Sequence, residues 1–227
     1  MKNIIKKYLS ATLCALLLCA FPLTLTACGD NPAPSTPSVT PSLTPSASPS
    51  VSPSVPTAPK PVIEITLADG RKMTAELYPD IAPQTVARVL ALVDQNLYDG
   101  VIFHRVIEDF MIQTGGFIPS AQGLLQLSAP SLYGEFYFNG FANDLLHEPG
   151  VLSMARTNAY NGASTQFFIC TAVCPHLDGY YAAFGKLTDA ESLEVAMDIS
   201  RVTTDAKYVF ASDVPQEDIV IQSIRRK

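Results

Sequence analysis

The stretch that decides the fold is Phe103-His104-Arg105-Val106-Ile107-Glu108-Asp109-Phe110-Met111-Ile112-Gln113-Thr114-Gly115-Gly116. A second informative stretch opens with Met154-Ala155-Arg156-Thr157 and closes with Gln166-Phe167-Phe168-Ile169. It is followed by Leu177-Asp178-Gly179 and Phe184-Gly185-Lys186. Taken singly, an arginine in such a strand is usually solvated and the aromatic residues are usually core. Only the ordered combination of the two stretches therefore carries information about function.

The residues around these stretches predict a domain made mainly of strands. Alternating patterns at 62–67 and 73–77 flank the turn Ala68-Asp69-Gly70, which predicts a hairpin. Apolar residues at helical spacing predict one helix that starts near Pro83 and a second from about Ala190 to Arg201. Many short strands with two helices favour a closed or nearly closed antiparallel barrel capped by the helices. The spacing alone also fits a sandwich.

On these motifs the chain resembles the cyclophilins, from about Val62 to Ile224. The family's Phe-His-Arg followed by Phe-Met-x-Gln-x-Gly-Gly stands at 103–116, and its Gln-Phe-Phe-Ile strand stands at 166–169. The resemblance implies a mainly β fold, namely a closed eight-stranded antiparallel barrel capped by two α-helices. It also implies peptidyl-prolyl cis/trans isomerase activity, with proline-containing unfolded or exported polypeptides as partners.

The resemblance further implies a set of site residues. Arg105 matches the catalytic arginine, and Gln113 matches the polar residue beside it. The apolar wall that receives the proline ring is matched by Phe103, Phe110, Met111, Phe168 and Leu177. Ala155 and Gln166 match the adjoining groove, and Arg156 falls where the family holds the substrate chain through its backbone.

Three places depart from the family pattern. His176 stands where many members carry Trp or Phe at the pocket rim, a position that strongly affects cyclosporin binding. Tyr181 occupies a place often held by His near the bound peptide. The segment 118–132 matches the family only weakly. These departures bear on substrate preference and on the response to the drug, whereas the residues of the reaction are retained.

The chemistry of X-Pro rotation needs few groups. The C–N bond of a peptide resists rotation by about 18–20 kcal/mol because of its partial double-bond character. A guanidinium beside the proline nitrogen can donate a hydrogen bond to the lone pair that rotation frees, and an apolar pocket strengthens that bond by excluding water. No nucleophile, metal or cofactor takes part, so none is expected. His104 is accordingly interpreted as structural.

The N-terminal part of the chain predicts export and lipidation. Residues 1–27 have the basic start and apolar run of a signal peptide, and Leu25-Thr26-Ala27-Cys28 resembles the bacterial lipobox, with Cys28 as the acylated residue. An ordinary secretory signal is the alternative. Residues 28–60 then comprise the lipidated Cys and a disordered Pro/Ser/Thr-rich stalk, and residues 61–227 form the isomerase domain. The predicted location is the extracytoplasmic face of a cell membrane, through the lipid anchor.

Charge and cysteine content exclude other classes. A net charge of −6 opposes binding to nucleic acid. Cys170 and Cys174 have no further cysteine nearby and His147 and His176 are far apart in sequence, so no metal site is expected. Two free thiols are the default expectation for the cysteine pair, and a disulfide is the alternative. The chain is expected to be monomeric.

Two other hypotheses stay open at this point. A non-catalytic chaperone or adhesin would use the same groove to hold proline-containing segments, and loss of Arg105 or Gln113 would favour it. Neither residue is lost. A passive envelope spacer would explain the stalk, but it would leave the groove residues without a role.

Overall fold

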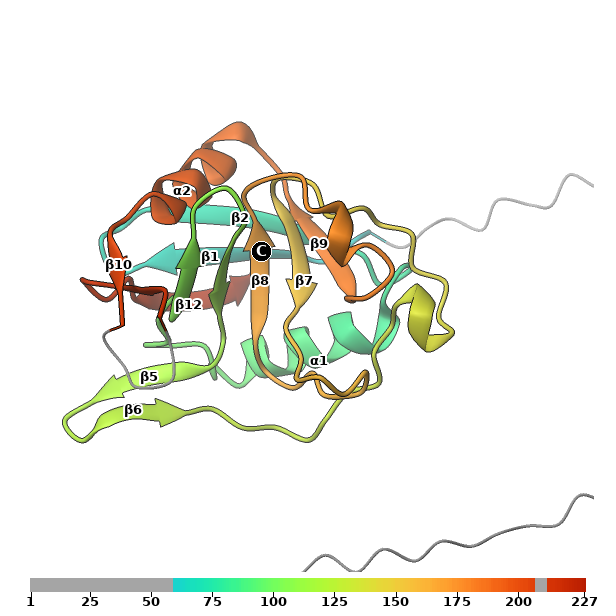
Figure 1. Cartoon of the computed structure of the whole chain (residues 1–227), viewed down its shortest axis with the longest axis horizontal. Helices are drawn as coiled ribbons and strands as arrows, with labels where there is room; N and C mark the ends of the chain where they lie inside the picture. The colour runs from blue at the N-terminus through green and yellow to red at the C-terminus, as the bar shows by residue number, and fades with distance from the viewer. Residues whose placement is uncertain (1–58, 207–211) are drawn as a thin grey trace, which may run out of the picture. The chain divides into compact units, whose positions relative to one another are not determined.

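The computed structural model describes residues 59–206 and 212–227, so the predicted signal peptide, Cys28 and nearly all of the stalk lie outside the described residues. The described part is built around one eight-stranded sheet whose neighbouring strands are antiparallel (Figure 1). In spatial order the strands are β12 (Ile221–Arg226), β1 (Val62–Leu67), β2 (Lys72–Leu77), β9 (Ala183–Leu187), β7 (Val151–Met154), β8 (Phe167–Cys170), β4 (Met111–Thr114) and β3 (Arg105–Ile107).

The two ends of this sheet meet just outside the named strands. Ile102 and Val220 form an isolated antiparallel bridge. The backbone N–H of Phe103 donates to the carbonyl of Ile219 over 3.0 Å, and the N–H of Ile221 donates to the carbonyl of Val101 over 2.8 Å. The sheet therefore curls into a barrel with a short seam between β3 and β12. The prediction of eight antiparallel strands with two helices is confirmed, and the single continuous sheet rules out the sandwich.

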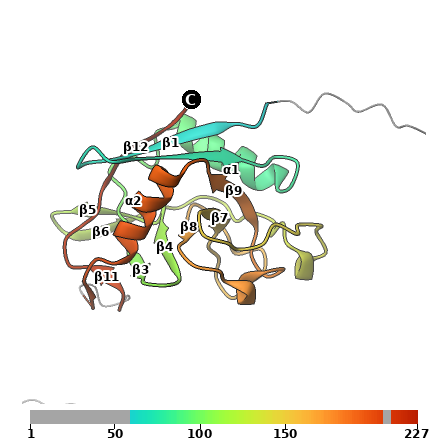
Figure 2. The same ribbon diagram turned by 90° about the horizontal axis from the view of Figure 1, so that it is seen from above.

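The two helices lie at opposite ends of the barrel. In Figures 1 and 2, α1 (Pro83–Asp94) covers one end and α2 (Ala190–Ser200) covers the other. Both helices start within a residue or two of the positions that their apolar spacing predicted. Within the described residues, neither helix has the length and apolar character needed to cross a membrane.

The free N–H groups in the first turn of the two helices are bound by different kinds of acceptor. In α2 the carboxylate of Asp189 accepts the N–H of Ser192 over 2.7 Å, an ordinary N-cap. The residue before α1 provides no side-chain cap. The carboxylate of Glu135, fully buried and about 50 residues further along the chain, accepts the N–H groups of Gln84 (3.0 Å) and Thr85 (2.8 Å) instead.

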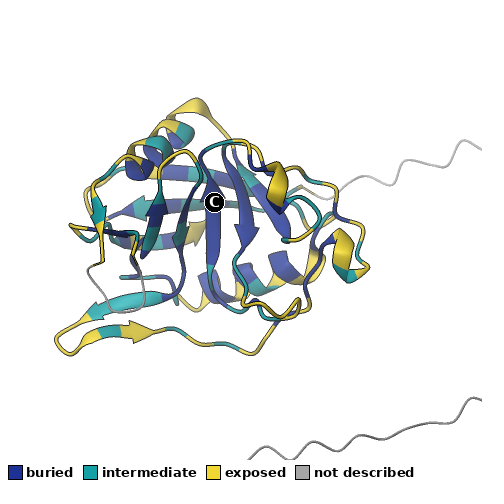
Figure 3. Ribbon diagram, viewed as in Figure 1, coloured by how far each residue is buried: buried dark blue, intermediate teal, exposed yellow. Residues whose placement is uncertain are grey.

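The main core fills the barrel interior and the space under the helices (Figure 3). Strand β1 shows how it is built, because every second residue is buried and the intervening ones are partly exposed. The largest fully buried side chains are Tyr98, Phe103, Phe136, Phe167, Phe184, Ile63, Ile65, Leu67, Met73, Leu77, Ile102 and Met111. All of these except Ile102 and Met111 belong to the main core.

Two small hairpins and two short 3₁₀ turns complete the described fold. The hairpin of β5 (Phe117–Ser120) and β6 (Gly123–Gln126) projects from the barrel in Figure 1, within the segment that matches the family weakly. Strands β10 (Thr204–Asp205) and β11 (Val214–Pro215) form the other hairpin. The turns are η1 (Tyr137–Asn139) and η2 (Pro175–Leu177), and Leu177 of η2 lines the cavity described next.

Candidate active site

The hairpin of β3 and β4 places the two polar candidates side by side. In its antiparallel register Arg105 lies opposite Gln113, and Ile107 lies opposite Met111. The turn between the strands contains Asp109 at φ 55°, in the left-handed region that Asp tolerates better than most residues. Because side chains alternate along a strand, Arg105 and Gln113 point away from the barrel interior.

These two side chains line a cavity of about 120 Å³ on the outside of the sheet. Its other walls are mostly apolar. The cavity is lined by Arg105, Phe110, Met111, Gln113, Ala155, Arg156, Phe168, Leu177 and Tyr181. The structure thus brings nine of the sequence-predicted site residues to one cavity, from segments as far apart as β3 and the loop before β9.

The guanidinium of Arg105 is oriented by an acidic residue that no sequence motif indicates. Arg105 Nε lies 3.6 Å from Asp213 Oδ2, and both side chains are partly exposed. The backbone N–H of Val106 also donates to the carbonyl of Asp213 over 2.8 Å, so the segment before β11 is fixed beside β3. Asp213 belongs to no motif, and only the folded chain places it next to the arginine.

Gln113 is held by a second amide. Its Nε2 donates to Oε1 of Gln166 over 2.8 Å and lies 3.4 Å from Nε2 of His104. His104 is buried, and this burial lowers the pKa of its imidazole to about 4. Neutral His104 and Gln166 thus form a support behind Gln113. Gln166 does not itself line the cavity, although the sequence placed it in the groove.

The apolar wall rests on a small cluster separate from the main core. Met111, Phe168 and Leu177 are almost fully buried and pack with the thiols of Cys170 and Cys174. Both cysteines are free, in agreement with the default expectation, and burial raises the pKa of both thiols. The cysteines therefore act here as small apolar side chains beneath the cavity.

Arg156 contributes a second guanidinium to the cavity wall. It lies over the rings of Tyr181, Tyr160 and Phe136, at 4.6, 5.2 and 5.3 Å from their centroids. Its Nε donates to the carbonyl of Tyr180 over 3.0 Å, and Nη1 donates to the carbonyl of Thr157 over 3.0 Å. These contacts fix the Arg156 side chain. The sequence pointed only to its backbone, and no sequence signal linked it to rings at positions 136 and 160.

Besides Gln166, two more of the predicted substrate-binding residues do not line the cavity. Phe103 is fully buried in the main core and has no access to a substrate. Its position precedes Arg105 by two residues, and it faces inward at the seam of the barrel. His176 lies at the rim, where its ring meets that of Phe110 with centroids 5.3 Å apart. Phe103 is therefore a core residue. His176 extends the apolar wall of the cavity on the side of Phe110.

A buried chain of three polar side chains supports the wall from below. Nδ1 of His147 lies 2.9 Å from Oδ1 of Asp178, and its Nε2 lies 2.9 Å from Oγ of Ser153. The residue types are those of a hydrolase triad, but Ser153 is fully buried and His147 is 1% exposed, so no substrate reaches them. Burial lowers the pKa of His147, and the neighbouring Asp178 opposes that shift. The chain is a structural brace that fixes Asp178 beside Leu177.

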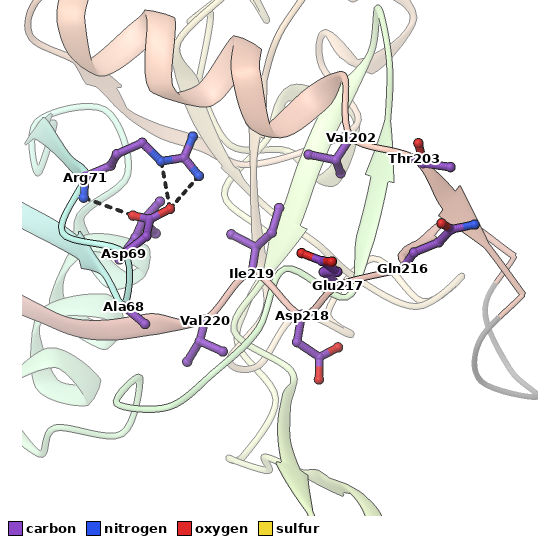
Figure 4. A pocket seen from close by; sticks show the side chains of 11 residues that line it. Ala68, Asp69, Arg71, Val202, Thr203, Gln216, Glu217, Asp218, Ile219 and Val220 are labelled. Atoms are coloured by element: carbon purple, nitrogen blue, oxygen red, sulfur yellow. Dashed lines mark hydrogen bonds and ion pairs between the residues drawn. The ribbon is translucent and has the colours of Figure 1, made fainter.

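A larger hollow, of about 530 Å³, lies elsewhere in the described domain (Figure 4). It is lined by the β1–β2 turn, by Val202 and Thr203 just after α2, and by the segment 216–220, and it shares no residue with the cavity above. Its ion pair, Arg71 with Asp69 at 2.7 Å, is exposed and satisfied within the turn. In residues 59–206 and 212–227 no group of three His, Cys, Asp or Glu side chains is arranged to hold a metal ion. The smaller cavity, where the two polar candidates meet the apolar wall, is therefore the candidate active site.

Comparisons with known proteins agree on what this chain resembles. The family model described as cyclophilin type peptidyl-prolyl cis-trans isomerase/CLD matches residues 62–226. Peptidyl-prolyl cis-trans isomerase B of Bacillus subtilis is 41% identical over 134 residues, which cover 59% of this chain and 87% of that protein. A Streptococcus pyogenes relative, whose name joins a phosphatase to a peptidyl-prolyl cis-trans isomerase, is 35% identical over 195 residues. That match covers 74% of this chain but only 38% of the relative.

A solved structure is similar over nearly the same region. The crystal structure of a cyclophilin type peptidyl-prolyl cis-trans isomerase from Cryptosporidium parvum aligns with a TM-score of 0.59 and 27% sequence identity. The alignment covers 74% of this chain and 98% of that one. The curled sheet with its two helices is thus the fold of that family.

Proposed function

Because the chain belongs to the cyclophilin-type peptidyl-prolyl cis-trans isomerase family, we propose that it accelerates X-Pro rotation in exported polypeptides at the extracytoplasmic face of a cell membrane. The isomerase activity is that of the family (EC 5.2.1.8). The observation that carries the proposal is the pairing of Arg105 with Gln113 at a cavity whose remaining walls are largely apolar.

The reaction makes and breaks no covalent bond. X-Pro bonds populate both isomers and exchange over tens to hundreds of seconds, because rotation must break the conjugation of the C–N bond. In the twisted state the proline nitrogen becomes pyramidal and its lone pair is free to accept a hydrogen bond. A catalyst therefore needs a donor that interacts with this nitrogen more strongly in the twisted state than in the planar one.

Arg105 is the proposed donor. Its Nε faces Asp213 at 3.6 Å, which leaves the terminal nitrogens of the guanidinium for the substrate. The proline ring would lie against Phe110, Met111 and Phe168, which line the same cavity. This apolar contact excludes water from the arginine and so strengthens its hydrogen bond in the twisted state.

Gln113 and Arg156 are proposed to hold the substrate backbone. The amide nitrogen of Gln113 is engaged by Gln166 at 2.8 Å, so its carbonyl oxygen is the group that can accept a substrate N–H. Arg156 is fixed by rings and carbonyls at the opposite wall. Two fixed walls orient the X-Pro bond between them, which is the positioning part of the catalysis.

The cellular place of the reaction is proposed from the sequence alone. Cys28 would carry the lipid, and two or more acyl chains on that residue would give stable attachment. A 32-residue stalk over 29–60, rich in Pro and Ser, would extend up to about 100 Å at about 3.1 Å per residue. An isomerase tethered in this way would meet polypeptides as they emerge from the membrane.

Exchange NMR on an Ala-Pro peptide tests the activity. Added protein is expected to broaden the cis and trans signals at substoichiometric amounts, because it speeds their exchange. Peptide binding without such broadening would instead support the non-catalytic chaperone or adhesin, and it would refute the catalytic assignment.

Cell fractionation tests the location separately. The full chain is expected in the membrane fraction, and Cys28→Ser is expected to move it out of that fraction. If the variant stays with the membrane as firmly as the wild type, the lipid anchor at Cys28 is wrong, whatever the result of the activity assay.

A further inference from the structure

Three aromatic side chains next to the cavity are exposed and touch one another. Tyr137, Phe138 and Tyr180 are 67%, 51% and 41% exposed. The ring of Phe138 stacks on that of Tyr180 with centroids 4.2 Å apart, and the ring of Tyr137 meets Phe138 edge-on at 5.3 Å. We call these three residues the aromatic platform. Exposed aromatic rings that gather in this way are typical of binding surfaces.

The platform is anchored by backbone contacts. The N–H of Phe138 donates to the carbonyl of Gly179 over 2.9 Å. Gly179 has φ +74°, and a Cβ at this position would come within 3.1 Å of the Phe138 ring, so the ring packs directly against the glycine backbone. Below it, Asn139 Nδ2 donates to Asn161 Oδ1 over 2.9 Å. The rings are therefore held in place before any ligand arrives, which lowers the entropy cost of binding.

The platform continues the wall of the candidate active site. Tyr180 precedes Tyr181, whose ring lines the cavity. Arg156, another residue of the cavity wall, donates from Nε to the carbonyl of Tyr180 and lies over the ring of Tyr181. The loop that follows η2 thus turns Tyr180 toward Phe138 and the next residue, Tyr181, toward the cavity, so one polypeptide can contact both surfaces.

We propose that the aromatic platform is a second subsite, which binds an aromatic side chain of the substrate polypeptide a few residues away from the isomerised proline. The proposal rests on the isomerase function proposed above. An extended chain advances about 3.3 Å per residue, so residues two to five positions from the proline lie about 7 to 17 Å away from it. The adjacent residues Tyr180 and Tyr181 belong to the platform and to the cavity wall, so we expect the subsite to lie within this range. Unfolded polypeptides expose aromatic side chains that folded proteins bury. A subsite of this kind would therefore select prolines that lie in unfolded segments.

A pair of peptide substrates tests the proposal with the full chain. Both peptides have the same length and charge and one X-Pro bond. One carries Phe three residues from the proline on each side, and the other carries Ser at those positions. The measured quantity is the ratio of kcat/KM for the Phe peptide to that for the Ser peptide, taken from exchange NMR. A ring contact of the usual strength predicts a ratio of about five for the wild type.

The variants Tyr137→Ser and Phe138→Ser are expected to reduce this ratio to about one. Leu125→Ser is the matched control, because Leu125 is 59% exposed and lies on β6 outside the platform. It is expected to keep the wild-type ratio. Since Tyr137 is the most exposed of the three rings, its variant tests the surface with little risk to folding, and thermal unfolding of each variant verifies this.

The outcomes separate the two proposals. If the wild type catalyses neither peptide, the proposed function fails. If the wild type catalyses both at equal kcat/KM, or if Tyr137→Ser and Phe138→Ser keep the wild-type ratio, the platform proposal fails while the function stands. Sedimentation at several concentrations tests a second copy of the chain as the occupant. Self-association that Tyr137→Ser abolishes, with peptide ratios unchanged, would also overturn the proposal.

Discussion

Strands β4 and β8 have two largely buried faces, of which one packs into the main core and the other borders the cavity. In their register Ile112 pairs with Ile169 and Thr114 pairs with Phe167, and these four face the barrel interior. The alternate pairs are Met111 with Cys170 and Gln113 with Phe168, and these face the cavity. Met111, Cys170 and Phe168 belong to the small cluster, which is separate from the main core.

The difference shows how one strand serves stability and function together. The inner face meets other core side chains on all sides, so its loss would be felt by the whole barrel. The outer face is covered by η2 and by partly buried side chains that include Ile107, Phe110 and Tyr181, and the cavity opens beside it. A substitution on the inner face should therefore act on the free energy of unfolding, and one on the outer face should act on kcat/KM.

The largest effect on kcat/KM is expected at Arg105, on the outer face. Arg105→Ala should lower kcat/KM by about 100-fold or more, because it removes the donor to the proline nitrogen. Its side chain is 41% exposed, so the free energy of unfolding should change by less than about 1 kcal/mol. A protease-coupled assay on an Ala-Pro peptide measures the rate, and urea unfolding measures the stability.

A matched arginine controls for loss of charge. Arg71→Ala removes a similarly exposed guanidinium, paired with Asp69 at the β1–β2 turn far from the cavity residues. It should leave kcat/KM within about twofold of the wild type. Equal rates for wild type and Arg105→Ala would show that the arginine is not the catalytic donor.

The next largest effect contrasts two neighbours in β8. Phe167→Ala should cost about 3–5 kcal/mol of stability, because its ring is 1% exposed and meets Tyr98 and Phe184 edge-on in the main core. Phe168→Ala should cost less stability and lower kcat/KM by about tenfold or more, since the ring borders the cavity. Chemical unfolding and the isomerase assay measure the two quantities. If both variants affected stability and rate in the same proportion, the division between faces would be wrong.

The sequence predicted the elements of this fold better than its contacts. The hairpin of β1 and β2, both helices and the β4 and β8 motifs follow from alternation, helical spacing and the family match. All of these are local in sequence. The place of Phe103 did not follow. Strand alternation would place Phe103 on the same face as Arg105, two residues later, but Phe103 precedes the start of β3 and its side chain is buried in the main core.

Long-range polar contacts could not be predicted from residue types. Asp213 lies beside Arg105 only because the segment before β11 is hydrogen-bonded to β3. Glu135 caps a helix that begins about 50 residues earlier, whereas the known sequence signals of helix caps lie within four residues of the helix start. The rings around Arg156 come from three separate loops. Such contacts depend on how loops meet, and one sequence carries no periodic signal for that.

Acid should lower the free energy of unfolding, through the buried histidines His104 and His147, before it lowers kcat/KM. Burial lowers the pKa of His104 from 6.5 to about 4 and also lowers that of His147. The unfolded chain therefore binds more protons between about pH 6.5 and 4, and stability should fall as pH falls through that window. At full protonation His104 alone accounts for up to about 3 kcal/mol. The reaction transfers no proton, so kcat/KM should stay flat from pH 6.5 to 9.

Urea unfolding at pH 7.5, 6.5 and 5.5 measures this slope. Above pH 5 the carboxylates contribute little, because the pKa values of Glu64, Asp69, Asp94 and Asp189 are lowered by their partners. His104→Asn should reduce the slope, because it removes the buried imidazole whose pKa is lowered. A slope unchanged in His104→Asn would mean that the buried imidazole titrates as it does in water.

The smallest effect on kcat/KM is expected at Glu135. This buried carboxylate caps α1 and, like the inner face of the sheet, serves stability. Glu135→Ala leaves the N–H groups of Gln84 and Thr85 without their acceptor at the start of α1. The expected loss is about 2 kcal/mol of stability, with kcat/KM of the folded fraction within about twofold of the wild type. Glu135→Gln keeps one acceptor oxygen and should lose less, which separates the cap from the packing of the side chain. If Glu135→Ala lowered kcat/KM of folded protein tenfold instead, then inner supports would also set the geometry of the cavity, and the two faces would not be independent.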